Sequence, residues 1–118
     1  MNLLELTTQL QEKLNELKHK YDTSEQPEDK RDKDFFAYVK RETTPIYEQI
    51  ELWEQQATEF VKQRKVRVHP QQVQSTTDNL KLLLMHSYYI DTRYHRYMEL
   101  HQSVHYVLDM LINDINDN

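Results

Sequence analysis

The chain has 118 residues, a net charge of −5, no glycine and no cysteine, and these features exclude several classes of chemistry. Without glycine it cannot form a phosphate-cradling P-loop, a dinucleotide-binding turn or a G-x-S-x-G nucleophile elbow. Without cysteine it has no disulfide, thiolate metal site or cysteine nucleophile, and its acidic balance argues against nucleic acid as a general partner.

The length fits one domain over residues 1–118 with a single hydrophobic core. A β-rich fold is disfavoured because its tight turns need positive φ angles, which glycine adopts most readily. The opening residues MNLLELTTQL lack the pattern of a signal peptide, and no apolar run reaches the roughly 18 residues of a membrane span. We therefore expect a cytoplasmic protein with no membrane partner.

Apolar residues recur at spacings of three and four along most of the chain, which is typical of amphipathic helices. The first helix is expected over residues 2–21, with Asn2 as its N-cap and Glu5 three residues later. Its apolar stripe consists of Leu3, Leu6, Leu10, Leu14, Leu17 and Tyr21. Residues 22–32 are polar and contain Pro27, and they predict a mobile loop.

The second apolar stripe covers residues 36–60 and keeps its phase across Pro45. A proline inside a helix removes one hydrogen bond, so either Thr44 caps a new helix at Pro45 or a single helix kinks there. We favour a short helix over residues 33–42 followed by a long one over 44–65.

Pro70 predicts the first residue of a third helix, whose core side includes Leu80. At 100° per residue, Leu82, Met85 and Tyr89 lie nearly opposite Leu80 and form a second apolar face. Such a face predicts a surface for a protein partner or for a second copy of the chain. The alternative is that the second helix or the loop over residues 22–32 covers it.

A fourth helix is expected from a cap at Asp91 or Thr92 to about Ile115. Four helices joined by short links predict an all-α, antiparallel up-and-down four-helix bundle. Three tyrosines, Tyr88, Tyr94 and Tyr97, are expected on or near the apolar faces, with their rings buried and their hydroxyl groups in water.

Several segments of the sequence resemble the YppE-like family, which comprises small proteins of Gram-positive bacilli. The segments are DFF at 34–36, WEQQATEFVKQRK at 53–65, VHPQQV at 68–73, DNLKLLLMHSYY at 78–89 and SVHYVLDMLINDI at 103–115. The resemblance implies a four-helix bundle of unassigned function. It provides no catalytic residues to carry over.

One pair of histidines has the spacing of a metal site. His101 and His105 are four residues apart and project from one helical face, with Asp109 a turn further on. This pair is similar to the H-x-x-x-H motif of DinB-like bundles, which add a third histidine from another helix. Here His86 and His69 do not match that third position. The simpler hypothesis is that both histidines border the core, about 40° and 80° from the centre of its stripe, with no cofactor bound.

A basic run near the end of the second helix, formed by Lys62, Arg64, Lys65 and Arg67, could bind an anion or a nucleic-acid backbone. The same residues have a structural explanation, because positive charge stabilises the last turn of a helix. Taken together, the sequence predicts a bundle without catalytic activity that acts by protein contact, as a homodimer or an adaptor. A DinB-like metal-binding bundle is the alternative.

Overall fold

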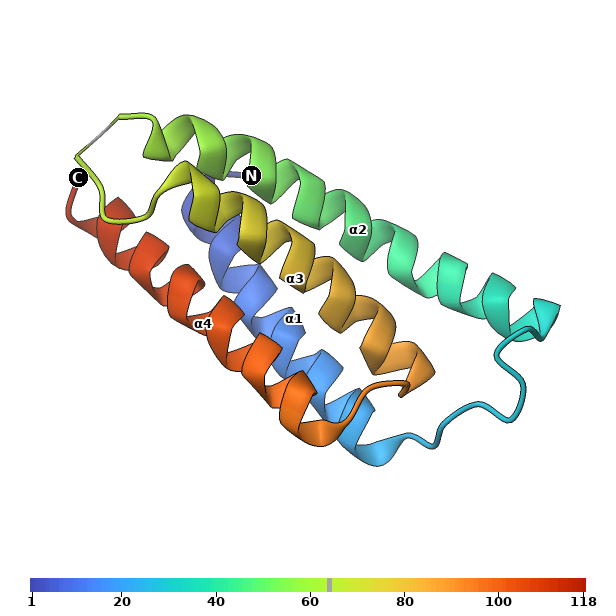
Figure 1. The fold of residues 1–118 in the computed structure, drawn as a ribbon. Coiled ribbons are helices and arrows are strands. Elements are labelled where there is room, and N and C mark those ends of the chain that lie inside the picture. The colour runs from blue at the N-terminus through green and yellow to red at the C-terminus, as the bar shows by residue number, and fades with distance from the viewer. Residues whose placement is uncertain (64) are drawn as a thin grey trace.

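The computed structural model describes residues 1–63 and 65–118, and this part of the chain forms four helices and no strand (Figure 1). The helices are α1 (Leu3–Thr23), α2 (Lys33–Val61), α3 (Pro70–Tyr89) and α4 (Tyr94–Asn116). Consecutive helices run in opposite directions and pack side by side (Figure 1). The predicted all-α four-helix bundle is therefore confirmed.

The four helices are not equivalent in their contacts. In the described residues, α1 packs against α2, α3 and α4, and α3 likewise packs against the other three helices, whereas α2 and α4 are not adjacent. The cross-section is therefore a rhombus whose short diagonal joins α1 and α3. The molecule measures 49 × 27 × 21 Å, with its long axis along the helices.

The core is formed by the apolar stripes that the spacing predicts. Trp53 of α2 and Tyr97 of α4 are its largest fully buried side chains. Around them lie leucines, isoleucine and valines from all four helices, including Leu6, Leu10, Leu14, Ile50, Leu83, Leu84, Val104, Leu108 and Leu111. Burial of apolar side chains is the main stabilising term of such a bundle.

Helix α1 has the expected N-terminal cap. The Asn2 side chain accepts a hydrogen bond from the backbone N–H of Glu5 at 2.8 Å. The helix extends two residues beyond the predicted end, to Thr23, and the connection to α2 covers residues 24–32.

The favoured break in α2 is wrong, because Pro45 lies inside one continuous helix of 29 residues. Thr44 does not cap a new helix, since its hydroxyl donates to the Lys40 carbonyl one turn back, at 2.6 Å. Pro45 is exposed, so water can reach the carbonyl that its missing N–H would have bonded. The core residues Thr43 and Ile50 on either side of Pro45 are buried, which keeps both halves of the helix in register.

A buried carboxylate fixes the connection between α2 and α3. Asp114 of α4 is 4% exposed and accepts hydrogen bonds from the backbone N–H groups of Arg67, at 2.9 Å, and Val68, at 3.0 Å. The Arg67 side chain adds a third bond at 3.1 Å. Burial by itself would raise the pKa of Asp114, but these bonds outweigh it and hold the pKa below its usual range.

The turn between α3 and α4 contains the single residue with positive φ among those described. Ile90 has φ 51° and ψ 44°, so a β-branched residue occupies the left-handed position that a glycine would normally take. Helix α4 then begins at Tyr94 with Arg93 as its N-cap, so the predicted caps at Asp91 and Thr92 are wrong. The Asp91 side chain instead lies 2.7 Å from His86 Nδ1.

Candidate functional sites

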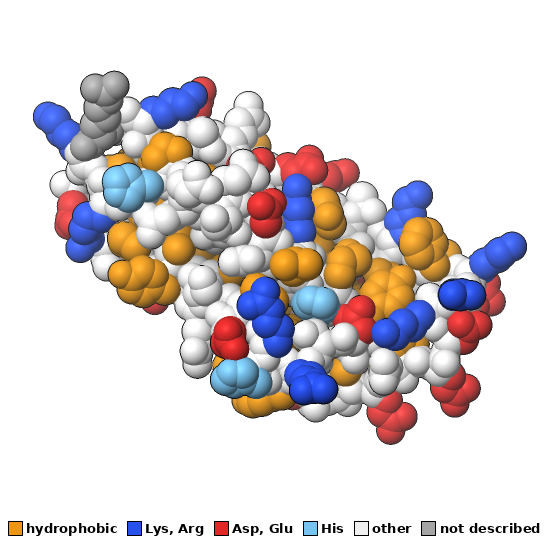
Figure 2. Space-filling view, in the orientation of Figure 1, with side chains coloured by type: hydrophobic (Ala, Val, Ile, Leu, Met, Phe, Trp, Pro, Cys, Tyr) orange, Lys and Arg blue, Asp and Glu red, His pale blue; other side chains and the backbone are white. Residues whose placement is uncertain are grey.

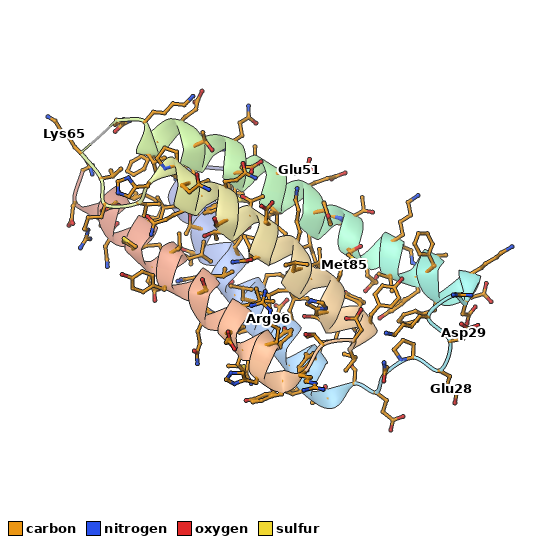
Figure 3. The ribbon with its side chains drawn as sticks, viewed as in Figure 1. Glu28, Asp29, Glu51, Lys65, Met85 and Arg96 are labelled. Carbon is orange, nitrogen blue, oxygen red and sulfur yellow. The ribbon has the colours of Figure 1, made fainter. Side chains whose placement is uncertain are left out.

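The predicted apolar face of α3 is partly covered by α2. Leu82 is 43% exposed, whereas Met85 and Tyr89 are half-buried and pack against the core. Figure 3 labels Met85 on α3, where its side chain lies beside α2. The Phe35 ring of α2 contacts Tyr89 edge-on, with 5.3 Å between the ring centroids. The face therefore continues onto α2 and does not belong to α3 alone.

Together these two helices form a small groove, which we call the α2–α3 groove. Its volume is about 240 Å³, and its lining residues are Phe36, Val39, Lys40, Thr43, Met85 and Tyr89. At its rim, Phe36 is 58% exposed. The sequence placed Phe36 in the core stripe, and this placement is wrong because the first turn of α2 projects past the end of α3 (Figure 1). Phe35, one residue earlier, takes the inward position.

Positive charge lies close to this groove. Lys40 is one of its lining residues, and Lys81 of α3 places its ammonium 5.3 Å from the centre of the Tyr47 ring of α2. Figure 2 shows the face formed by α2, α3 and α4, with lysine and arginine side chains interspersed among hydrophobic ones toward the first turns of α2.

Two of the three predicted metal ligands of α4, His101 and His105, lie in the seam between α4 and α1. A column of rings runs along this seam: Tyr21 stacks on Tyr97 at 4.0 Å, His101 follows Tyr97 at 6.3 Å, and His105 follows His101 at 4.6 Å. The hydroxyl of Tyr97 lies 2.7 Å from that of Ser87. These contacts make the column part of the hydrophobic core.

His101 is more deeply buried than the sequence indicates. Its side chain is 7% exposed, and Nε2 has no hydrogen-bond partner among the described residues. Burial lowers the pKa of His101, and the neighbouring His105 lowers it further. Burial also lowers the pKa of the half-buried His105. Burial raises the pKa of Tyr97 to about 12. Burial therefore favours the neutral form of each of these three side chains.

The seam does not bring a third metal ligand to the histidine pair. Within residues 1–63 and 65–118, no group of three histidine, aspartate or glutamate side chains is placed to hold a metal ion. Asp109 accepts a hydrogen bond from Gln11 of α1. His86 is engaged with Asp91, and His69 precedes α3 at the opposite end of the bundle.

The predicted basic site is divided by the structure. Arg64 lies outside the described residues, and Lys62 and Lys65 are exposed. Arg67 bonds Asp114 and lies 3.7 Å from Asp117. Helix α2 ends at Val61 and not at residue 65 as predicted, so the basic run begins at its C-cap, Lys62, and does not lie in its last turn. Of the described members, Arg67 serves to hold the α2–α3 connection.

Of the three tyrosines expected at apolar faces, two are buried and one is exposed. Tyr97 is fully buried and Tyr88 is 9% exposed, but Tyr94 is 58% exposed and does not belong to the core.

None of the helices in the described residues has the length and apolarity that spanning a bilayer requires.

Comparison with known proteins gives a consistent family and fold. A family described as a bacterial domain of unknown function (DUF1798) matches residues 7–115. The crystal structure of protein yppE from Bacillus subtilis is 27% identical, with a TM-score of 0.84, and the match covers 98% of this chain and 93% of that one. The solution NMR structure of the same protein is 25% identical, with a TM-score of 0.79 and the same coverage. Comparison with curated proteins gave no match.

The resemblance to the YppE-like family noted in the sequence is thereby confirmed. The matched region extends from the second turn of α1 to the last turn of α4 and so includes all four helices. The chain belongs to the DUF1798 family of bacterial domains of unknown function.

Proposed function

We propose that this protein is a non-catalytic cytoplasmic bundle that acts by protein contact through the α2–α3 groove. The observation that carries the proposal is that the exposed Phe36 lines the groove with the half-buried Met85 and Tyr89, while the exposed Leu82 lies one turn before Met85 on α3. Apolar side chains that gather on one surface, and are not scattered singly, usually mark an interaction site. The lack of cysteine suits a reducing compartment.

Several polar groups inside the bundle have structural roles, and this supports a non-catalytic function. The hydroxyl of Tyr21 donates to the carbonyl of Thr92 at 2.6 Å, and that of Ser87 lies 2.6 Å from the carbonyl of Leu83. Asp114 is fully used in holding the α2–α3 connection. Each of these groups forms a hydrogen bond with the backbone of the protein itself.

The experiment compares two double variants of the full chain. Phe36→Ser with Leu82→Ser removes the exposed apolar side chains in the groove and on the turn of α3 next to it, and Leu52→Ser with Tyr106→Ser removes two similarly exposed ones elsewhere. Self-association is measured by analytical ultracentrifugation. Binding of other proteins is measured by pull-down from bacterial cytosol, followed by reconstitution of each complex from purified components.

We expect the wild type and the Leu52/Tyr106 variant to share a protein contact, either self-association or binding of another protein. The Phe36/Leu82 variant should lose this contact. The proposal is contradicted when every contact of the wild type survives in the Phe36/Leu82 variant, provided that circular dichroism shows all three proteins folded.

A further inference from the structure

The spacing and charge of the residues at the α2–α3 groove indicate the kind of partner that fits it. We propose that the groove binds an amphipathic helix of another protein, in which a row of apolar side chains is bordered by aspartate or glutamate. This inference rests on the proposed function and goes further by assigning the chemistry of the partner.

The spacing of the apolar side chains suits a helix. On α2, Phe36, Val39 and Thr43 line the groove at intervals of three and four residues. On α3, Met85 and Tyr89 line the groove four residues apart, and the exposed Leu82 lies three residues before Met85. Seven residues of helix span about 10 Å, or two turns. A helix lying between α2 and α3 would therefore contact these side chains with its own residues i, i+3 or i+4, and i+7.

The charges around the groove select an acidic partner. Lys40 is the charged residue of the lining, which contains no carboxylate. Lys81 lies next to Leu82, and in the described part of the chain neither lysine forms an ion pair. A carboxylate on each side of the partner's apolar row could meet these two ammonium groups, and such complementarity favours encounter and register.

The same charges argue against a second copy as the occupant. The whole chain carries a net charge of −5, so two copies repel each other at low ionic strength, whereas a local acidic helix on a neutral or basic protein does not meet that repulsion. The lining of the groove has a lysine and no carboxylate, although the whole chain is acidic, and this is the arrangement expected of a surface that recognises an acidic segment.

The probes are two designed peptides of about 18 alanine-rich residues, long enough for partial helicity. Both carry leucine at positions i, i+3, i+7 and i+11, and they differ in having glutamate or lysine on both sides of that row. Binding of fluorescein-labelled peptide to the full-length protein is measured by anisotropy at about 0.05 M and 0.5 M sodium chloride, which differ severalfold in screening length.

We expect the glutamate peptide to bind at least about tenfold more tightly than the lysine peptide at low salt, and this preference to shrink at high salt. Lys40→Glu with Lys81→Glu should reverse the preference. Phe36→Ser with Leu82→Ser should weaken binding of the glutamate peptide, while Leu52→Ser with Tyr106→Ser leaves it unchanged. Equal binding of both peptides, tighter binding of the lysine peptide, or binding of neither overturns the inference.

The same variants separate this inference from the function on which it rests. Self-association that depends on Phe36 and Leu82 overturns the acidic-helix partner but supports a contact function for the groove. Peptide binding and protein contacts that are both unaffected by Phe36→Ser with Leu82→Ser contradict the two proposals together.

Discussion

The indole N–H of Trp53 donates a hydrogen bond to the hydroxyl of Thr7 at 3.0 Å, and this bond joins α2 to α1 inside the core. Both side chains are completely buried. The Thr7 hydroxyl in turn donates to the carbonyl of Leu3 at 2.7 Å, so one threonine satisfies the only polar atom of the largest core side chain. A buried donor without an acceptor is costly, which makes this pair a sensitive test of the packing.

Replacement of Thr7 by valine keeps the shape of the side chain and removes its acceptor. We expect the free energy of unfolding to fall by about 1–3 kcal/mol, because the indole N–H of Trp53 is left buried and unpaired. Thr7→Ser keeps the hydroxyl and should cost less than Thr7→Val. Urea unfolding followed by tryptophan fluorescence measures both. A loss in Thr7→Val that is no larger than the loss in Thr7→Ser would show that the hydrogen bond contributes no more to stability than the methyl group does.

Asp114 should be the most sensitive charged residue of the described chain. Asp114→Ala leaves the backbone N–H groups of Arg67 and Val68 without their acceptor, and we expect a loss of about 2–4 kcal/mol in unfolding free energy. Asp117→Asn is the control, since Asp117 is 73% exposed and its distance from Arg67 is 3.7 Å, so it should change stability by less than about 0.5 kcal/mol.

The pKa of Asp114 adds an acid-dependent component to the same measurement. Its folded pKa lies below the ordinary value of 3.8, so its contribution is complete above that pH and is lost as the pH falls below it. The difference in unfolding free energy between the wild type and Asp114→Ala should therefore become smaller when urea unfolding is measured at strongly acidic pH. A gap that stays constant down to the lowest accessible pH would contradict the assignment.

The histidines of α4 predict a second loss of stability on acidification, which begins at a higher pH than the loss due to Asp114. His101 and His105 have folded pKa values below the ordinary 6.5, so the unfolded chain binds protons first. Their contribution is complete above pH 6.5 and falls as the pH drops through that value toward the folded pKa. We expect His101→Gln with His105→Gln to flatten the dependence of unfolding free energy on pH between about 7.5 and 5.

The charged groups around these histidines do not reverse that sign. On α1, Lys18 lowers the pKa of His101 and Asp22 raises it, and Asp109 raises that of His105, but burial is the largest influence on each. His95→Gln serves as the control, because the His95 side chain is 90% exposed. A pH dependence that the double variant shares with the wild type would rule out the pair as its source.

The proline inside α2 should reduce stability in the wild type. A proline within a helix costs about 3 kcal/mol relative to alanine, and roughly 1 kcal/mol of this is offset because proline also restricts the unfolded chain. Pro45→Ala should therefore raise the free energy of unfolding by about 1–2 kcal/mol. The exposed neighbour Glu51 supplies the control, Glu51→Ala, with an expected change below about 0.5 kcal/mol. Unchanged or lower stability in Pro45→Ala would show that the helix needs the bend that proline favours.

The four helices follow from the sequence because the apolar spacing of three and four residues is nearly uninterrupted, and Asn2 and Pro70 start two of them as predicted. The details that fail depend on neighbours in space. Pro45 signals a lost hydrogen bond, but the chain carries no local sign that packing on both sides would keep α2 continuous. The cap expected at Asp91 is missing because its carboxylate contacts His86.

The sequence predicts the α3 side of the candidate groove but not its α2 side, because the α2 side depends on which helices are neighbours in space. Periodicity places Leu82, Met85 and Tyr89 on one face of α3, and the structure keeps that face. The contribution of Phe36 required knowing which helix lies beside α3 and where α2 begins relative to it. Periodicity also places His101 near the edge of the α4 stripe, yet α1 covers it, so a residue expected at the border is a core residue.

The position of α1 at the short diagonal of the bundle has a consequence for synthesis on the ribosome. Among the four helices α1 is translated first, yet its leucines complete their burial only against α2, α3 and α4. They remain uncovered until α4 has left the exit tunnel, which makes this nascent chain a candidate client for chaperones that hold exposed leucine-rich helices.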